Sequence, residues 1–191
     1  MRKIAILAAA GALLALSACG KGEEEAAGGA SGEPQTAQEV ASEMKKIAIQ
    51  PGEWESTTEV VDVRMDNPPQ GMPNGMLDMM KGRKTSTKNC ITPEQAANPE
   101  AEFLASQKND QCTYKGFEMS GGVIKGTVSC PSGDGGTADV AMTGSYTPAS
   151  YVMEMEMNAA NLGGPSTAGM AMWMKMRTTG KRIGECAADG K

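Results

Sequence analysis

The sequence contains no histidine, which narrows the chemistry open to the protein. Histidine is the usual general base near neutral pH, a common metal ligand and the partner of the nucleophile in Ser/His and Cys/His pairs. Carboxylates such as Glu118, Asp134 and Asp139 are present, but their spacing does not single out an acid and base pair. We therefore expect a non-enzymatic protein that needs no cofactor.

Aromatic side chains and positive charge are also scarce. Aromatic residues make up 4% of the 191 residues, against 16 methionines and 24 glycines, so the interior must be filled by aliphatic and thioether side chains. The formal charge is -5, and removal of residues 1–18 would leave 16 basic residues against 23 acidic ones, a balance of -7. This excess of negative charge argues against nucleic acid or anionic lipid as a partner.

Residues 1–18 have the features of an export signal. A basic start is followed by an apolar run that is too short to span a bilayer comfortably. The run ends on Leu16-Ser-Ala-Cys19, which matches the bacterial lipobox, in which the cysteine is diacylated and the chain is cut before it. An ordinary secretory signal with an incidental cysteine is the alternative. We expect a lipid anchor at Cys19, because two acyl chains hold a protein on a membrane lastingly whereas one does not.

Gly20 follows the cysteine, whereas an aspartate there usually marks retention in the inner membrane. The expected location is therefore the outer membrane of a Gram-negative bacterium, facing the periplasm. Residues 19–35 lack large apolar side chains and predict a flexible acidic tether. A capping box formed by Thr36 and Glu39, with apolar residues at helical spacing, then predicts an amphipathic helix over 36–49. We expect it to pack on the domain; a lid or a membrane-surface helix is the alternative.

The remaining residues, 50–191, predict one disulfide-bonded β domain. Apolar residues move from even to odd positions between Val60 and Val61, which indicates a β-bulge there. Thr92 and Gln95 form a capping box with a proline between them, which predicts the start of a short helix. The fold class we expect is mainly β: an antiparallel meander sheet or small open barrel of about seven strands, with one or two short helices packed on it.

The segment from Cys112 to Cys130 predicts a hairpin with two possible registers. A three-residue loop at 120–122 pairs Tyr114 with Val128 and sets the two cysteines opposite each other. A two-residue glycine turn would place the cysteines on different faces. We favour the first register because it lets the cysteines bond. It also implies the pairs Met119 with Val123 and Glu118 with Ile124.

Two methionine ladders, Tyr151–Met157 and Met170–Met176, place methionine at every second position. This alternation predicts two strands with a methionine face, which could be a core, a pocket or a metal site. A turn at 147–150 would add the apolar residues of the preceding strand to that face, so we interpret the ladders as core. The expected cross-strand partners are Tyr146–Tyr151, Gly144–Met153, Met142–Met155, Val140–Met157, Met157–Met170, Met155–Met172 and Met153–Met174.

The segment 66–82 is too rich in Pro and Gly for a regular element and too apolar for a simple spacer. Thioethers are soft ligands, so a cluster of them could bind Cu(I) or Ag(I) in the periplasm. Methionine is more often a core residue, and soft-metal sites usually add His or Cys. Metal binding is therefore the alternative hypothesis, with the candidates Met72, Met76, Met79 and Met80.

Four cysteines remain besides Cys19, and four can pair in three ways. None of their spacings resembles a C-x-x-C redox or zinc motif, and an oxidising compartment favours disulfides. The preferred hairpin register pairs Cys112 with Cys130. This leaves Cys90 to pair with Cys186, which would tie an early strand to the last one.

Several short motifs add a resemblance. They are P-G-E-W-E at 51–55, C-I-T-P-E at 90–94, the Cys112 and Cys130 pair, G-S-Y at 144–146 and R-I-G-E-C at 182–186. Together they resemble a family of small exported proteobacterial proteins known as domain of unknown function 3617, over about residues 51 to 186. The resemblance implies export and disulfides, but it supplies no catalytic or binding residues.

These observations favour a non-enzymatic, lipid-anchored envelope protein. Its methionine face, which adapts easily in shape, would bind an apolar ligand or another envelope component. The expected partners are the membrane, through the anchor, and that ligand or protein, but no nucleic acid. The alternative is a periplasmic methionine-rich protein that binds Cu(I) or Ag(I).

Overall fold

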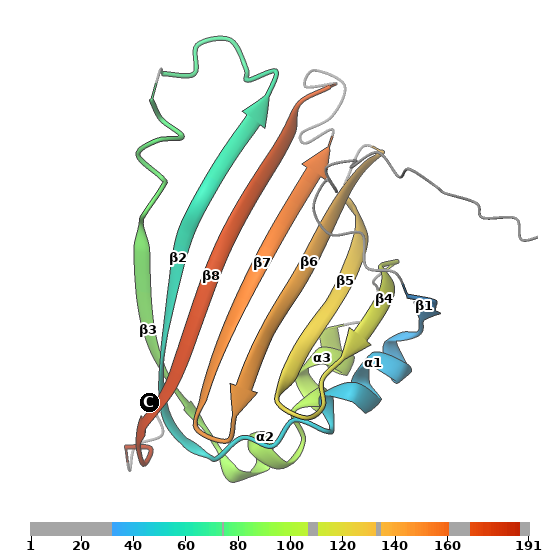
Figure 1. Ribbon diagram of the computed structural model, residues 1–191, viewed down its shortest axis with the longest axis vertical. Helices are drawn as coiled ribbons and strands as arrows, with labels where there is room; N and C mark the ends of the chain where they lie inside the picture. Colours follow the sequence, from blue (N-terminus) through green and yellow to red (C-terminus); the bar gives the residue numbers. More distant parts are fainter. Residues whose placement is uncertain (1–31, 74, 107–110, 133–134, 161–168, 188–191) are drawn as a thin grey trace, which may run out of the picture.

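The computed structural model describes residues 32–73, 75–106, 111–132, 135–160 and 169–187. The predicted signal segment, Cys19, most of the tether and Asp134 lie outside the described residues. Within these residues eight strands form one antiparallel sheet (Figure 1). The strands are β1 (Pro34–Gln35), β2 (Gly52–Asp66), β3 (Lys84–Ile91), β4 (Thr113–Glu118), β5 (Val123–Ser132), β6 (Gly136–Thr147), β7 (Ser150–Ala160) and β8 (Ala171–Gly184).

The sheet has the strand order β1-β4-β5-β6-β7-β8-β2-β3. Strands β4 to β8 are a meander in which each strand pairs with the next along the chain. The β2–β3 hairpin, which comes earlier in the chain, instead adds to the far side of β8. The predicted mainly β, antiparallel fold class is confirmed, and the position of β2 beside the last strand is the departure from a simple meander.

Three short helices occur in the described part of the chain: α1 (Ala37–Met44), α2 (Pro93–Ala97) and α3 (Glu100–Ser106). Both predicted capping boxes are present, one at Thr36 with Glu39 and one at Thr92 with Gln95. Each satisfies two backbone N–H groups that would otherwise lack a partner. The first helix ends at Met44 rather than at residue 49. Ordered structure also begins before it, because β1 pairs with β4.

The hairpin between β4 and β5 corrects the predicted turn. Tyr114 does pair with Val128, but Glu118 pairs with Lys125 and not with Ile124. The turn is the two-residue Gly121-Gly122 form, in which both glycines have positive φ and Val123 N–H donates to Ser120 O. An irregularity between Lys115 and Glu118 inserts one residue into β4, which restores the register that brings the cysteines together.

The ladders form strands as predicted, but one of their two registers was wrong. The β6–β7 pairs follow the prediction, including Met142 with Met155 and Val140 with Met157. Between β7 and β8, however, Met157 pairs with Met174 and Met155 with Met176. The shift is an even number of residues, so every methionine keeps its face.

A β-bulge interrupts β2 where the sequence predicts it. Val60 pairs with Met176 and Asp62 with Lys175, which leaves Val61 as the extra residue. After the bulge the odd-numbered residues of β2 turn to the methionine side of the sheet. Val63 lies opposite Met174 there, and its side chain is fully buried.

The densest core lies beside the ladders and not on them. Val40 of α1 packs with Tyr114, Phe117 and Met119, and all four are buried. The Tyr114 ring makes edge contacts with Phe103 of α3 and with Phe117, at centroid distances of 5.9 and 5.8 Å. The core therefore lies between α1, α3 and the β4–β5 end of the sheet.

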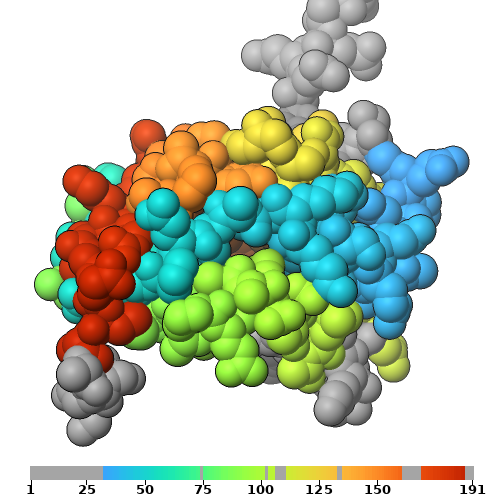
Figure 2. All heavy atoms as spheres, turned by 90° about the horizontal axis from the view of Figure 1, so that it is seen from below, coloured from blue at the N-terminus to red at the C-terminus, as the bar shows by residue number. Residues whose placement is uncertain are grey.

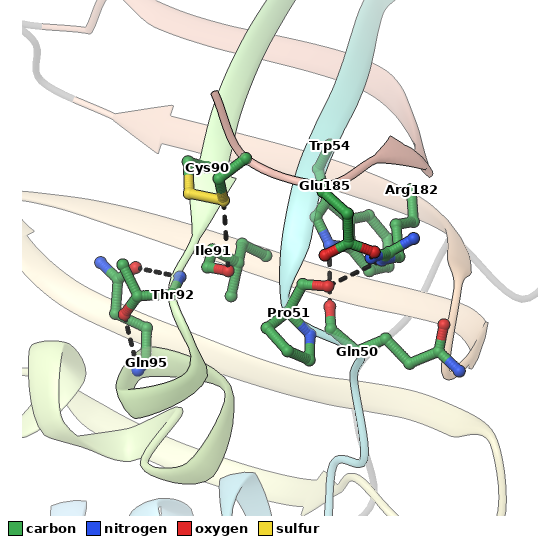
Figure 3. The surroundings of a disulfide bond; sticks show 10 residues. Gln50, Pro51, Trp54, Cys90, Ile91, Thr92, Gln95, Arg182 and Glu185 are labelled. Carbon is green, nitrogen blue, oxygen red and sulfur yellow. Dashed lines mark hydrogen bonds and ion pairs between the residues drawn. A yellow bond between two sulfur atoms is a disulfide. The ribbon is translucent and has the colours of Figure 1, made fainter. Parts of the chain in front are cut away.

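Both predicted cysteine pairs lie at disulfide distance. The Cα atoms of Cys112 and Cys130 are 4.2 Å apart, and those of Cys90 and Cys186 are 5.4 Å apart. The second pair joins β3 to the segment after β8, close to the start of α2 (Figure 3). Near this crosslink, a hydrogen bond also joins β8 to the residue before β2: Arg182 Nε donates to Pro51 O at 2.7 Å.

Candidate apolar binding surface

The register of four adjacent strands assembles one continuous methionine face. Cross-strand partners point to the same side of a sheet, so each row across β6, β7, β8 and β2 shares a face. One row, for example, runs Val140, Met157, Met174 and Val63. The eight methionines of this face are Met65, Met142, Met153, Met155, Met157, Met172, Met174 and Met176.

The methionine face is neither closed nor fully open. All eight methionines are half-buried. In a view onto the sheet, α1 and α3 lie beside β4 and β5, and no helix of the described chain overlaps the upper parts of β7, β8 and β2 (Figure 1). Seen from the helical end, the segment that leads into β2 and the helices α2 and α3 lie next to the strand ends, on one side of the sheet (Figure 2). The helices thus close one end of the face and leave the other without a helical cover.

Two stacked aromatic rings lie at the end of the methionine face that the helices cover, and we call them the aromatic floor. Trp54 is 1% exposed and stacks on Tyr151 with ring centroids 6.1 Å apart. The Tyr151 hydroxyl shares a 2.8 Å hydrogen bond with Ser56, and Trp54 Nε1 donates to Gln50 O at 3.0 Å (Figure 3). The polar atoms of both rings are therefore satisfied inside the protein. Gly180 leaves the room for the Tyr151 ring, because a Cβ at this position would overlap ring atoms.

At the opposite end of the sheet, the loop after β2 and the end of β2 line an open hollow of about 420 Å³. Val63 and Met65 of the methionine face also line this hollow, so the two surfaces adjoin. Of the four methionines proposed as metal ligands, Met72 and Met76 line it as well. Met79 is 71% exposed, and neither it nor Met80 is among the lining residues. The structure thus brings two of the four candidates to one hollow.

The outer face of the same strands carries charge. Lys175 of β8 lies 3.1 Å from Glu156 and 3.3 Å from Glu154, both on β7. Hydrogen bonds from this ammonium group, first to Glu156 and then to Glu154, raise the pKa of Lys175 above its usual value. Exposed pairs of this kind add little stability, but they keep the outer face in water. Because this face of the sheet is charged and wet, the opposite face, on which the methionines lie, is the apolar one.

Two of the three carboxylates considered as acid or base candidates, Glu118 and Asp139, lie in the described residues. Glu118 pairs with Lys125 at 2.6 Å, and Asp139 is exposed. No group of three or more His, Cys, Asp or Glu side chains that could hold a metal ion occurs in this part of the chain. Among the described residues, the strongly buried carboxylate Glu100 forms an ion pair with Lys45 at 3.2 Å, which joins α3 to α1.

Sequence reasoning missed the β2 side of this surface. Val63 and Met65 show the correct alternation after the bulge, but nothing local indicates that β2 pairs with the last strand. It also missed the Trp54 and Tyr151 stack, because the two rings are far apart in the chain and meet only across that pairing. The usable signal was the phase change at Val60, which turns the later part of β2 toward the methionines.

Comparison with known proteins assigns the chain to a family. A family model described as "Protein of unknown function (DUF3617)" matches residues 49–186, which is most of the chain. The chain belongs to the DUF3617 family. No curated protein and no solved structure matches it. The matched DUF3617 region begins just before β2 and ends at Cys186, so it includes the whole methionine face and both cysteine pairs.

None of the three helices described in this DUF3617 protein combines the length and apolar character that a membrane crossing would require.

Proposed function

We propose that this DUF3617 protein is a non-enzymatic, lipid-anchored envelope protein that binds an apolar ligand on its methionine face. The observation that supports the proposal is a continuous face of eight methionines, all half-buried, that the helices cover at one end only. Methionine is a poorer strand former than the β-branched residues, and its flexible, polarisable side chain adapts to irregular apolar shapes.

The size of the face suits an extended hydrocarbon chain. Rows follow one another every second residue along a strand, which is a spacing of about 7 Å, so four rows span roughly 20 Å. From the open end toward the aromatic floor, the successive rows contain Met172, Met157, Met176 and Met153. Burying apolar surface of this extent contributes about 25 cal/mol per Å². An acyl chain lying along the strands would make full use of it.

Fluorescence titration of the protein with a fluorescent fatty acid tests this proposal. The variant Met155→Gln/Met157→Gln keeps the side-chain shape but makes the centre of the face polar. Each change should remove about 1 kcal/mol or more of apolar contact, so we expect affinity to fall by about tenfold or more. The control is Asn158→Gln, which alters the same strand on its outer face. Equal affinities in the two variants, or no binding by the parent, would refute the proposal.

The lipid anchor is tested separately, because Cys19 lies outside the described residues. We expect the full chain to incorporate labelled palmitate in a Gram-negative host and to fractionate with the outer membrane. A Cys19→Ala variant should lose the label. Retention of the label by this variant would reject Cys19 as the acylated residue.

Metal binding has less support, because only Met72 and Met76 of the four candidates share the hollow. Titration with Cu(I) under reducing conditions decides between the two functions. Uptake that a Met72→Leu/Met76→Leu variant abolishes would favour the metal hypothesis. Absence of uptake by the parent would end it.

A further inference from the structure

Exposed apolar side chains are concentrated at one end of the molecule. The described part of the chain exposes five large apolar side chains, and three of these belong to the region around the loop after β2. We call the described loop residues 67–73 and 75–82 the β2–β3 loop. Met79 is 71% exposed, Met76 is 39% exposed, and Val61 at the neighbouring bulge is 43% exposed. Isolated apolar residues need no explanation, but two in one loop, with a third in the strand that leads into it, indicate an interaction surface.

The position of this loop relates it to the methionine face. It lies at the end of the sheet opposite the helices (Figure 1), where the face has no helical cover. The hollow beneath it is lined both by loop residues such as Met72 and by Met65 of that face. The hollow, whose lining also includes Arg64, Asp78 and Lys81, thus connects the methionine face with the exposed loop.

Four of the charged groups around the loop pair with one another. Lys81 lies 3.2 Å from Asp62 and 3.4 Å from Asp78, and Arg64 donates to Asp62 at 2.7 Å. The Arg64 guanidinium also lies 4.6 Å from the ring centroid of Trp173. These groups leave no strong field of either sign, so the loop would be attracted neither to an anionic surface nor to a cationic one. Arginine and tryptophan beside an apolar tip are typical of proteins that rest at a membrane interface.

We propose that the β2–β3 loop docks on the surface of a zwitterionic lipid bilayer and inserts Met76 and Met79 at the boundary between headgroups and acyl chains. Insertion of two methionines alone would be weak, because binding of this kind scales with the apolar area buried. The sequence places 14 residues between Cys19 and Pro34, which can reach roughly 50 Å when extended, so an anchored protein could present this end to the membrane. The contact would bring the open end of the methionine face against the lipid.

Quenching by brominated lipids tests this contact directly. The full chain carrying Met79→Trp is mixed with zwitterionic phosphatidylcholine vesicles whose acyl chains are brominated near the headgroup. We expect loss of the added tryptophan emission relative to the parent, with a shift to shorter wavelength. The matched control is Ala97→Trp, an exposed position on α2 at the opposite end of the molecule, which should keep its emission.

Three outcomes would overturn the proposal: unchanged emission from the Met79→Trp variant, equal quenching at both positions, or quenching only with anionic vesicles at low salt. Both positions are exposed, so neither variant should disturb folding, and far-UV circular dichroism checks this. The result is independent of the proposed ligand binding. A protein that fails to bind the fluorescent fatty acid could still show the quenching, and the reverse also holds.

Discussion

A single glycine sets the fit of the aromatic floor. The Tyr151 ring lies over Gly180, and its stacking on Trp54 and its bond to Ser56 leave it little freedom to move aside. Gly180→Ala should therefore lower the free energy of unfolding by about 1–3 kcal/mol, the usual cost of overpacking. Urea unfolding measures this loss. The control Gly184→Ala adds its methyl group to open space, and a similar loss there would contradict the explanation.

A second prediction at this scale concerns Asp62. Hydrogen bonds from Arg64 and then Lys81 lower the pKa of its carboxyl below the usual value. A depressed folded-state pKa stabilises the protein at pH values above the unfolded-state pKa of about 3.9, and this contribution disappears as the pH falls through the folded-state pKa. Asp62→Asn should thus be less stable than the parent at neutral pH and should approach it in acid.

Urea midpoints of the parent and Asp62→Asn, measured from neutral pH to below about pH 3, give the comparison. The difference should be small, because the ion pairs are exposed. Asp66→Asn changes another exposed carboxylate of the same strand and serves as the control. A difference between parent and Asp62→Asn that is the same at every pH would show that the carboxylate charge is not involved.

At the scale of elements, the two cysteine pairs should differ in their contribution to stability. Their separations are 96 residues for Cys90 and Cys186 and 18 residues for Cys112 and Cys130. Loop-closure entropy predicts a loss of about 4–5 kcal/mol when the longer crosslink is removed and about 3 kcal/mol for the shorter one. Guanidinium unfolding of the two double serine variants gives the comparison. The opposite order would mean that residual structure or strain outweighs chain entropy.

Elements with a local signal could be predicted from the sequence. The capping boxes at Thr36 and Thr92 mark helix starts because the cap side chains lie within four residues of one another. The turn Thr147–Ser150 is short enough to set the β6–β7 register without other information. The β-bulge at Val61 was visible as a change of phase in one strand.

Registers that depend on distant or compensating features could not be predicted. The connection from β7 to β8 is long, and shifts by an even number of residues leave the methionine face unchanged, so the pattern alone could not choose between them. In the β4–β5 hairpin an irregularity beside Gly116 offsets the shorter turn. Glycine has no side chain that would reveal such a change of phase.

At the scale of the whole molecule, the sequence predicted the methionine face but not its surroundings. The ladders define which side chains lie together, whereas the cover of the face depends on where the helices pack. The helices pack on the β4–β5 end because Tyr114 and Phe117 supply the aromatic partners there. This tertiary choice leaves Met172 and Met65 near the uncovered end.

Methionine oxidation should report this distribution of exposure. Hydrogen peroxide converts the thioether to a sulfoxide, and the rate depends on access. Met79 and then Met76 should oxidise first, the half-buried methionines of the sheet later, and buried Met119 last. Peptide mass spectrometry after timed exposure measures the order. Oxidation of Met119 as fast as that of Met79 would contradict the described packing.

The pairing of β2 with β8 also imposes an order on folding. Strands β4 to β8 can form by successive local hairpins, and β2 can pair locally with β3, but the β2–β8 pairing joins residues about 120 positions apart, as Thr58 and Thr178 show. Such long-range pairing slows folding. The Cys112–Cys130 crosslink can therefore close early, whereas Cys90 and Cys186 meet only after β8 has docked. Closure of the second crosslink would thus mark the completed fold.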